Sequence, residues 1–293
     1  MLSRKEFKEN SEVVSAIKDI TGIYQEIALL RMNQLKSGVE ATRYFLNGVA
    51  EVYNHAKAAY IASWQKGPFA DKKQTEEPSL IKRNGKTLLV CLTANEHLYG
   101  NLILNIWYQF VTDLKADRKN EAVVAGIFGR YLMKNEKIEI PSTNYFSLED
   151  DKPTKNQLSK IINFISKYEK IIIYYGQMIS VLEQNSTRAS ITGNIFQEKK
   201  VTESKNYLFE PSPEKIMGFF ETEIISALFI QKVYEHELAK FASRTVAMDQ
   251  ATENANEMLK KLNRDFNTLH KQILNRKQLE VFAGFGLWGG KNE

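Results

Sequence analysis

The sequence is poor in the residues and runs that mark disulfide-rich, secreted or membrane-spanning proteins. It contains a single cysteine, Cys91, which excludes an internal disulfide framework and fits a reducing compartment. No apolar run approaches the roughly 18 residues that a membrane-spanning helix needs, and residues 1–12 are polar rather than signal-like. These absences predict a soluble, cytoplasmic protein.

Recognisable catalytic motifs are also missing. The sequence has no P-loop, no GxGxxG, no HExxH and no CxxC. The four histidines are scattered, and His236 stands between two glutamates that point in other directions on a helix. Cys91 falls in an apolar run, which favours a buried, inert thiol over a nucleophile. We therefore expect no active site, no metal site and no cofactor bound by this chain.

Charge is nearly balanced except near one end of the chain. The net charge of +5 comes from 40 basic and 35 acidic side chains. Between residues 258 and 277, however, Asp265 is the lone acidic residue among six basic ones: Lys260, Lys261, Arg264, Lys271, Arg276 and Lys277. Such a stripe fits an acidic protein surface, nucleic acid or a merely solvated helix face. The modest overall excess and the lack of a reading element argue against nucleic acid.

The placement of proline predicts two long helices. All six prolines lie between Pro68 and Pro213, so both chain ends lack the strongest helix breaker. Apolar residues at both ends recur at steps of three and four, which is typical of one helix face. The expected seams are Val13, Ile17, Ile20, Tyr24, Ile27, Leu30, Leu35, Val39, Leu46, Val49 and Tyr53, and then Met248, Ala251, Ala255, Met258, Leu262, Phe266, Leu269 and Ile273.

Helices of this length cannot fit inside a globule of this size, so we expect them to pair as an antiparallel two-helix coiled coil. The middle of the chain differs. Expected strands at 86–93, 121–127 and 171–175 alternate with helices at 98–114 and 153–167, and residues 184–197 suit a hairpin arm. Trp107 and Tyr108 are expected in the core. This alternation predicts a small, mostly parallel α/β sheet domain.

The predicted fold class is therefore α/β with a long coiled coil. The expected domains are an N-terminal coiled-coil helix (1–64), an α/β globular domain with flanking linkers (65–205), and a C-terminal coiled-coil helix with a tip (206–293). The linkers are expected at Gln65–Lys82 and Glu198–Lys205.

Ordered motifs in both end segments and in the middle point to one family. The C-terminal segment has Glu210-Pro211-Ser212-Pro213, then Ser243–Met248 (SRTVAM), then Ala251, Thr252, Asn254 and Ala255. Farther on come Phe266-Asn267 and Glu280-Val281 with Gly284. The segment Lys18–Arg31 contributes Ile20, Thr21, Ala28 and Arg31, and Val90–Leu102 contributes Leu98 and Gly100. In this order, these motifs resemble the γ subunit of F-type ATP synthases.

The resemblance implies a non-catalytic shaft in a rotary ATPase. Its tip would turn inside a hexamer of α and β subunits, and its rotation would be coupled to nucleotide binding, synthesis or hydrolysis at β. The sheet domain and lower coil would engage an ε-type subunit and the membrane c-ring. ATP, ADP and magnesium would sit on partner subunits, and the chain would lie at the inner face of the cell membrane through partners alone.

The resemblance also implies which residues meet the hexamer. The implied contacts of the shaft are Ile20, Thr21, Arg31, Arg244, Met248, Lys260, Lys261, Arg264, Asn267, His270, Lys271 and Glu280. The implied tip in the bearing is Val281, Phe282, Gly284, Phe285 and Trp288.

The sequence departs from the family pattern at several of these positions. His270-Lys271 stands for Arg-Gln, which loses the bidentate guanidinium, and Ile23-Tyr24 stands for Ala-Met. The tip carries Phe282, Phe285 and Trp288 where alanines are usual. Two interpretations stay open: an ordinary proton-linked ATP synthase, or a specialised F-type-like ATPase that hydrolyses ATP for other work such as gliding motility. A coiled-coil adaptor without rotation would not explain the motifs.

Overall fold

The computed structural model describes residues 4–65, 83–117, 119–138, 140–141, 144–150, 153–192 and 213–288. Packing divides the chain into two units, Met1–Ile27 with Thr245–Glu293, and Ala28–Arg244. The predicted linkers, apart from Gln65, and the motif residues Glu210–Ser212 lie outside the described residues.

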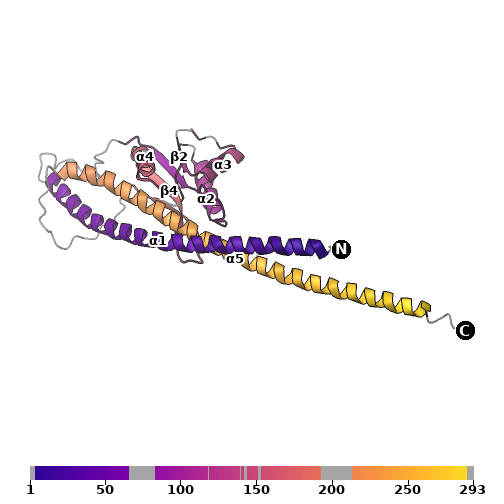
Figure 1. The fold of residues 1–293 in the computed structure, drawn as a ribbon. Coiled ribbons are helices and arrows are strands. Elements are labelled where there is room, and N and C mark those ends of the chain that lie inside the picture. The colour runs from indigo at the N-terminus through magenta and orange to yellow at the C-terminus, as the bar shows by residue number, and fades with distance from the viewer. Residues whose placement is uncertain are drawn as a thin grey trace. The chain divides into compact units, whose positions relative to one another are not determined.

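Two long helices dominate the fold, as predicted (Figure 1). Helix α1 runs over Arg4–Gln65 and helix α5 over Pro213–Trp288. Proline fits the first position of α5 because its missing N–H would have no partner in the helix there.

The coiled-coil seam of the first unit does not use the predicted face of α1. Phe7, Val14 and Thr21, spaced by seven, are buried, while Val13 and Ile20 are more than half exposed. The Thr21 and Thr252 hydroxyls lie 2.8 Å apart across the seam. The rings of Phe7 and Phe266 meet edge to face, with centroids 6.2 Å apart.

The physical reason for the different seam is register. A strict seven-residue repeat keeps one face turned to a partner helix, and small residues let the backbones approach. The isoleucine-rich positions fall one residue earlier and point about 100° away from the seam. On α5, Met248 and Ala255 are buried as predicted, but Met258 is 55% exposed and Leu259 is half-buried in its place.

The second unit continues the pairing of the two helices. Ala28, Met32 and Val39 of α1 are buried together with Leu238, Phe241 and Ala242 of α5. Met178, at the end of a strand, packs against this cluster. Within this unit the sheet domain therefore contacts the paired helices.

The sheet has five strands in the order β3-β2-β1-β4-β5. Their bounds are Thr87–Leu92 (β1), Glu121–Ala125 (β2), Tyr145–Phe146 (β3), Lys170–Met178 (β4) and Gln184–Ser190 (β5). The central strand β1 pairs in parallel with β2 and β4, so that Val90 lies opposite Val123 and Ile173. Only the hairpin β4–β5 is antiparallel among the described pairs, and the prediction of a mostly parallel sheet is confirmed.

Both faces of the sheet are covered, as a parallel sheet requires. Leu88, Val90 and Leu92 pack with α4 (Lys155–Ile165) and with residues 224–233 of α5. The alternate residues Leu89 and Cys91 pack with α2 (Leu102–Ala116) and, on the same side, α3 (Ile127–Asn135). Helix α5 is therefore part of the core of the sheet domain.

Several local expectations need correction. Helix α2 begins at Leu102 rather than Leu98, because Leu98 and Gly100 adopt positive φ values of 73° and 54° that a helix cannot hold. The short α3 and β3 were not predicted. Trp107 is buried and donates to Glu136, but Tyr108 is 61% exposed and is not a core residue.

Candidate partner-binding surfaces

An apolar stripe lies exposed on α1 beside the seam of the first unit. Each of its six members is between 41% and 58% exposed; we call them the outer stripe: Val13, Ile17, Ile20, Ile23, Tyr24 and Ile27. The neighbours Val14 and Thr21 are buried in the seam, so the stripe is a second apolar face of the same helix. A contiguous exposed apolar face marks an interaction surface.

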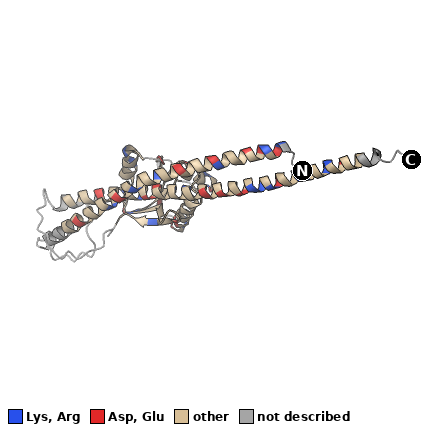
Figure 2. Cartoon of the chain, turned by 60° about the horizontal axis from the view of Figure 1, so that its bottom comes forward, with Lys and Arg blue, Asp and Glu red and all other residues tan. Residues whose placement is uncertain are grey.

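A basic surface lies on α5 of the same unit. The basic patch comprises Lys260, Lys261, Arg264, Lys271, Arg276 and Lys277, all exposed. Figure 2 shows blue residues recurring along the C-terminal half of α5. Within the described part of the chain, Arg276 pairs with Glu280 at 3.2 Å, while the patch lysines and Arg264 make no ion pair. These charges face solvent, where an acidic surface would complement them.

Most of the contact residues implied by the resemblance lie on the surface. Exposed side chains are Ile20, Lys260, Lys261, Arg264, Asn267, His270, Lys271 and Glu280, and Arg31 is half-buried. Thr21 and Met248 are instead buried in the coiled coil, at 9% and 5% exposure. In the chain by itself the seam covers both side chains.

Arg244 also faces inward. It is 4% exposed, donates to Glu96 at 2.7 Å and to the carbonyl oxygen of His97 at 2.9 Å, and lies 4.1 Å from the centre of the Tyr99 ring. Its guanidinium therefore pairs with the loop after β1 of the sheet domain.

The expected tip residues lie at the end of α5. Val281, Phe282 and Gly284 are exposed, and Phe282 reaches 72%. Phe285 and Trp288 belong to the helix, but their side chains lie outside the described residues.

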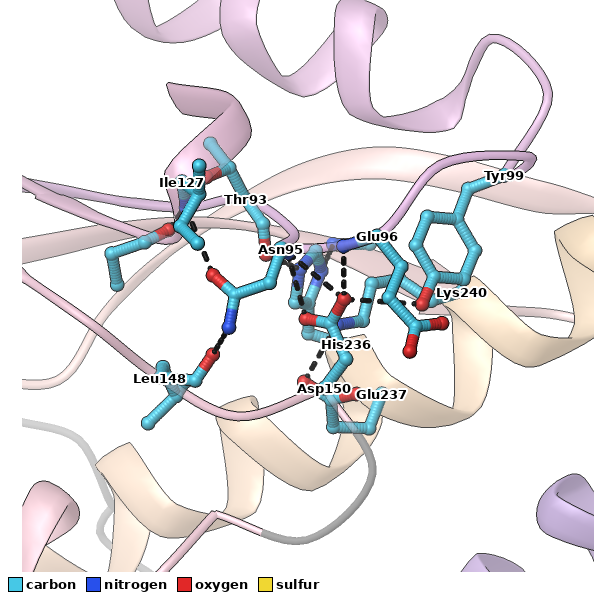
Figure 3. A network of polar contacts seen from close by, with 12 residues as sticks. Thr93, Asn95, Glu96, Tyr99, Ile127, Leu148, Asp150, His236, Glu237 and Lys240 are labelled. Atoms are coloured by element: carbon cyan, nitrogen blue, oxygen red, sulfur yellow. Dashed lines mark hydrogen bonds and ion pairs between the residues drawn. The ribbon is translucent and has the colours of Figure 1, made fainter. Parts of the chain in front are cut away.

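A polar cluster joins α5 to the sheet in the second unit (Figure 3). Lys240 is fully buried and donates to Asp150 at 2.7 Å, and it lies 2.9 Å from Glu237 one turn before it. His236, one turn before Lys240, is also fully buried. We call Asp150, His236, Glu237 and Lys240 the polar clasp.

Asp150 is held from several directions. It lies in the loop between β3 and α4 and accepts the backbone N–H groups of Asn95, at 2.9 and 3.0 Å, and of Glu96, at 2.7 Å. The Tyr99 hydroxyl donates to it at 3.3 Å. Burial by itself raises the pKa of Asp150, but Lys240 and these N–H groups outweigh burial and hold the pKa below its usual value.

His236 bridges two neighbouring strands. The N–H of Gly176 in β4 donates to Nδ1 at 3.0 Å, so Nε2 carries the proton and donates to the carbonyl oxygen of Thr93, at the end of β1, at 3.1 Å. Burial, helped by the charge of Lys240, lowers the pKa of His236 to about 3. The ring is therefore neutral at physiological pH.

The clasp occupies the carboxyl edge of the parallel strands. In open α/β sheets this edge is where ligands usually bind, but here α5 fills it with its own side chains. Sequence reasoning missed the clasp, although charged residues among Leu238, Ala239 and Phe241 on a helix face were a usable signal. Among the described residues, no cluster of three or more His, Cys, Asp or Glu side chains is arranged to hold a metal ion.

Comparison with known proteins gives a consistent family. The family model described as ATP synthase matches residues 3–285. The ATP synthase gamma chain of Chloroflexus aurantiacus is 22% identical over 97% of this chain and 98% of that one. The ATP synthase gamma chain of Mesoplasma florum is 24% identical over 92% of each.

The fold is also found in a solved structure. A chain from the Tetrahymena thermophila mitochondrial ATP synthase central stalk and c-ring superposes with a TM-score of 0.54 at 18% identity. The match covers 79% of this chain and 99% of that chain. Separately, none of the described helices has the length and apolar character needed to cross a membrane.

Proposed function

The chain belongs to the ATP synthase gamma family, the central-stalk subunits of rotary ATPases, and we propose that it turns as the shaft inside a hexamer of α and β subunits. In this proposal rotation and nucleotide affinity are linked: each orientation of an asymmetric shaft favours a different state of the surrounding β subunits.

The single observation that carries the proposal is the outer stripe. A self-sufficient two-helix coiled coil would bury its most apolar face, yet here the seam uses Val14 and Thr21 and leaves Val13 and Ile20 exposed. A shaft needs two apolar faces. One holds its two helices together, and the other contacts the surrounding hexamer. The stripe supports an apolar bearing surface of the hexamer as its partner.

The basic patch supports a second contact of different chemistry. Its lysines and Arg264 are exposed and make no ion pair within the described residues. Acidic loops of the β subunits would complement them, and charge complementarity of this kind sets association rate and orientation more than affinity.

The chain supplies no catalytic group in this proposal. ATP, ADP and magnesium bind to partner subunits, and an ε-type subunit and the c-ring engage the sheet domain and the lower coil. The chain is then held at the inner face of the cell membrane by its partners alone.

A second candidate is the shaft of an F-type-like ATPase that drives other mechanical work, such as gliding motility. The observation that favours it is the bulky, exposed tip, in which Phe282 is 72% exposed. His270, whose ring stacks on Phe266 with centroids 6.3 Å apart, is also unlike the usual arginine at the gripping position.

Affinity purification of the tagged chain from its own cells tests the proposal. Recovery of α, β, ε-type and c-ring subunits is the expected result for a synthase shaft. Recovery of α- and β-like subunits without a c-ring would select the diverted motor. Purification without any α- or β-like subunit would overturn both.

A further inference from the structure

We propose that the polar clasp is the joint that fixes the sheet domain to α5 against twisting, so that the two turn as one body. This inference rests on the proposed function, since a joint against twist matters only in a rotor. It assigns a mechanical positioning role to Asp150, His236, Glu237 and Lys240.

Apolar packing alone would make a poor torsional joint. The part of α5 that covers the sheet does so with Ile224, Ile225, Leu228, Phe229 and Val233. The stabilisation from such burial is large but non-directional, and it changes little when a helix rolls or slides slightly on the sheet. Directional contacts lie at the end of this stretch and beyond it: the Lys232 ammonium lies 4.9 Å from the centre of the Tyr175 ring of β4, and His236 and Lys240 follow one and two turns later.

The ion-paired part of the clasp admits one register. Lys240 and Glu237 are 0% and 1% exposed, and Asp150 is 4% exposed at the side chain. A slip of α5 by one turn, about 5.4 Å, would carry Lys240 and Glu237 along together but would separate Lys240 from Asp150 and leave that carboxylate buried without its cation. Breaking a buried pair in this way is strongly unfavourable.

The histidine adds a second, independent anchor. His236 bonds to the carbonyl of Thr93, the residue directly after β1, and to the Gly176 N–H of β4, so it connects two adjacent strands at once. Gly176 permits this approach: a Cβ there would lie 3.2 Å from Ala239 Cβ and 3.0 Å from Leu102. Helix α5 therefore packs close against strand β4 at this position, which opposes rotation of the helix on the strand.

Stability alone does not account for this chemistry. Replacing a buried ion pair by well-packed apolar residues is often neutral or stabilising. A buried Lys with two carboxylates, set between apolar neighbours such as Leu238 and Phe241, instead contributes specificity of position. In a shaft, contacts that allow a single position of the helix on the sheet resist twisting of one against the other.

The test compares angular fluctuation at two labels on the chain, assembled with its hexamer and paused between steps. One probe is attached at Lys160→Cys on α4, and the other at Glu223→Cys on α5; both positions are exposed, whereas Cys91 is buried. The clasp variant combines Lys240→Met, Asp150→Asn and Glu237→Gln, which removes all three charges together. A second variant, His236→Gln, tests the other anchor.

We expect the clasp variant to keep its Tm within about 5 °C and to rotate, while angular variance rises at the α4 label and stays unchanged at the α5 label. The control, Lys86→Met with Glu121→Gln, removes a 2.6 Å ion pair between the residue before β1 and the first residue of β2, a pair with no bond to α5 among the described side chains. It should change neither label.

Unchanged variance at the α4 label in a rotating clasp variant would overturn the joint, and so would a rise at both labels. Should the triple variant fail to fold, the same comparison with His236→Gln decides. Failure of the wild-type chain to rotate would overturn the shaft itself, which is a separate outcome.

Discussion

His236 is a fully buried, neutral histidine with both ring nitrogens engaged, and this makes it a source of pH-dependent stability. Its pKa in the fold is about 3, against 6.5 when unfolded. Below 6.5 the unfolded chain takes up a proton that the folded chain refuses. The contribution of the neutral His236 to the free energy of unfolding is therefore fully present above pH 6.5 and is lost as the pH falls toward 3.

Between pH 7 and pH 5 this histidine should lower the free energy of unfolding by about 2 kcal/mol. Urea titrations at the two pH values measure the change, and His236→Gln should show a smaller pH dependence by that amount. Equal pH dependence in wild type and variant would contradict a neutral, buried His236.

Cys91 is a second fully buried residue whose burial can be tested. The thiol is fully buried in β1, and burial raises its pKa far above the usual range. We expect a thiol-disulfide reagent at pH 8 to leave Cys91 unmodified in the native chain and to titrate one thiol in urea. Rapid labelling of the native chain would show that β1 is accessible.

At the scale of the element, the seam of the first unit offers a matched pair of valines. Val14 is 7% exposed and Val13 is 58% exposed. Val14→Ala should destabilise the chain by about 1 to 2 kcal/mol through lost packing, and Val13→Ala should stay within about 0.5 kcal/mol. Chemical unfolding of both variants measures this difference. A larger loss of stability in Val13→Ala than in Val14→Ala would support the seam predicted from the sequence instead.

The same pair shows how far local pattern reaches. The two long helices and the three central strands follow from proline placement and apolar run length, which are local properties. The choice between Val13 and Val14 is not local, because it depends on where α5 presents Thr252, 231 residues from Thr21. The larger isoleucines therefore suggested the wrong face.

The polar clasp could not be predicted from the sequence for a related reason. Its main ion pair joins residues that are 90 positions apart, and its aspartate sits in a loop whose position depends on the sheet order. The family motifs pointed to a shaft, yet they also suggested outward roles for Thr21, Arg244 and Met248, which the fold buries. Motif similarity specifies residue type but does not specify exposure.

At the scale of the whole molecule, the basic patch should govern how fast the chain enters the proposed hexamer. Lys260→Glu with Lys271→Glu should slow association by about tenfold at low salt and weaken its salt dependence, because steering acts through long-range charge. Stopped-flow binding to the hexamer measures the rate. Lys155→Glu with Lys160→Glu on α4 is the control, and an equal effect there would contradict a localised patch.

The measurement that tests the shaft most directly is rotation of a single complex. The chain is assembled with the α and β subunits proposed as its partners, the hexamer is fixed to a surface, and a probe is attached at Lys160→Cys. We predict that ATP drives the probe in one direction, with pauses at each third of a turn. A complex that hydrolyses ATP while the probe stays still would contradict the shaft.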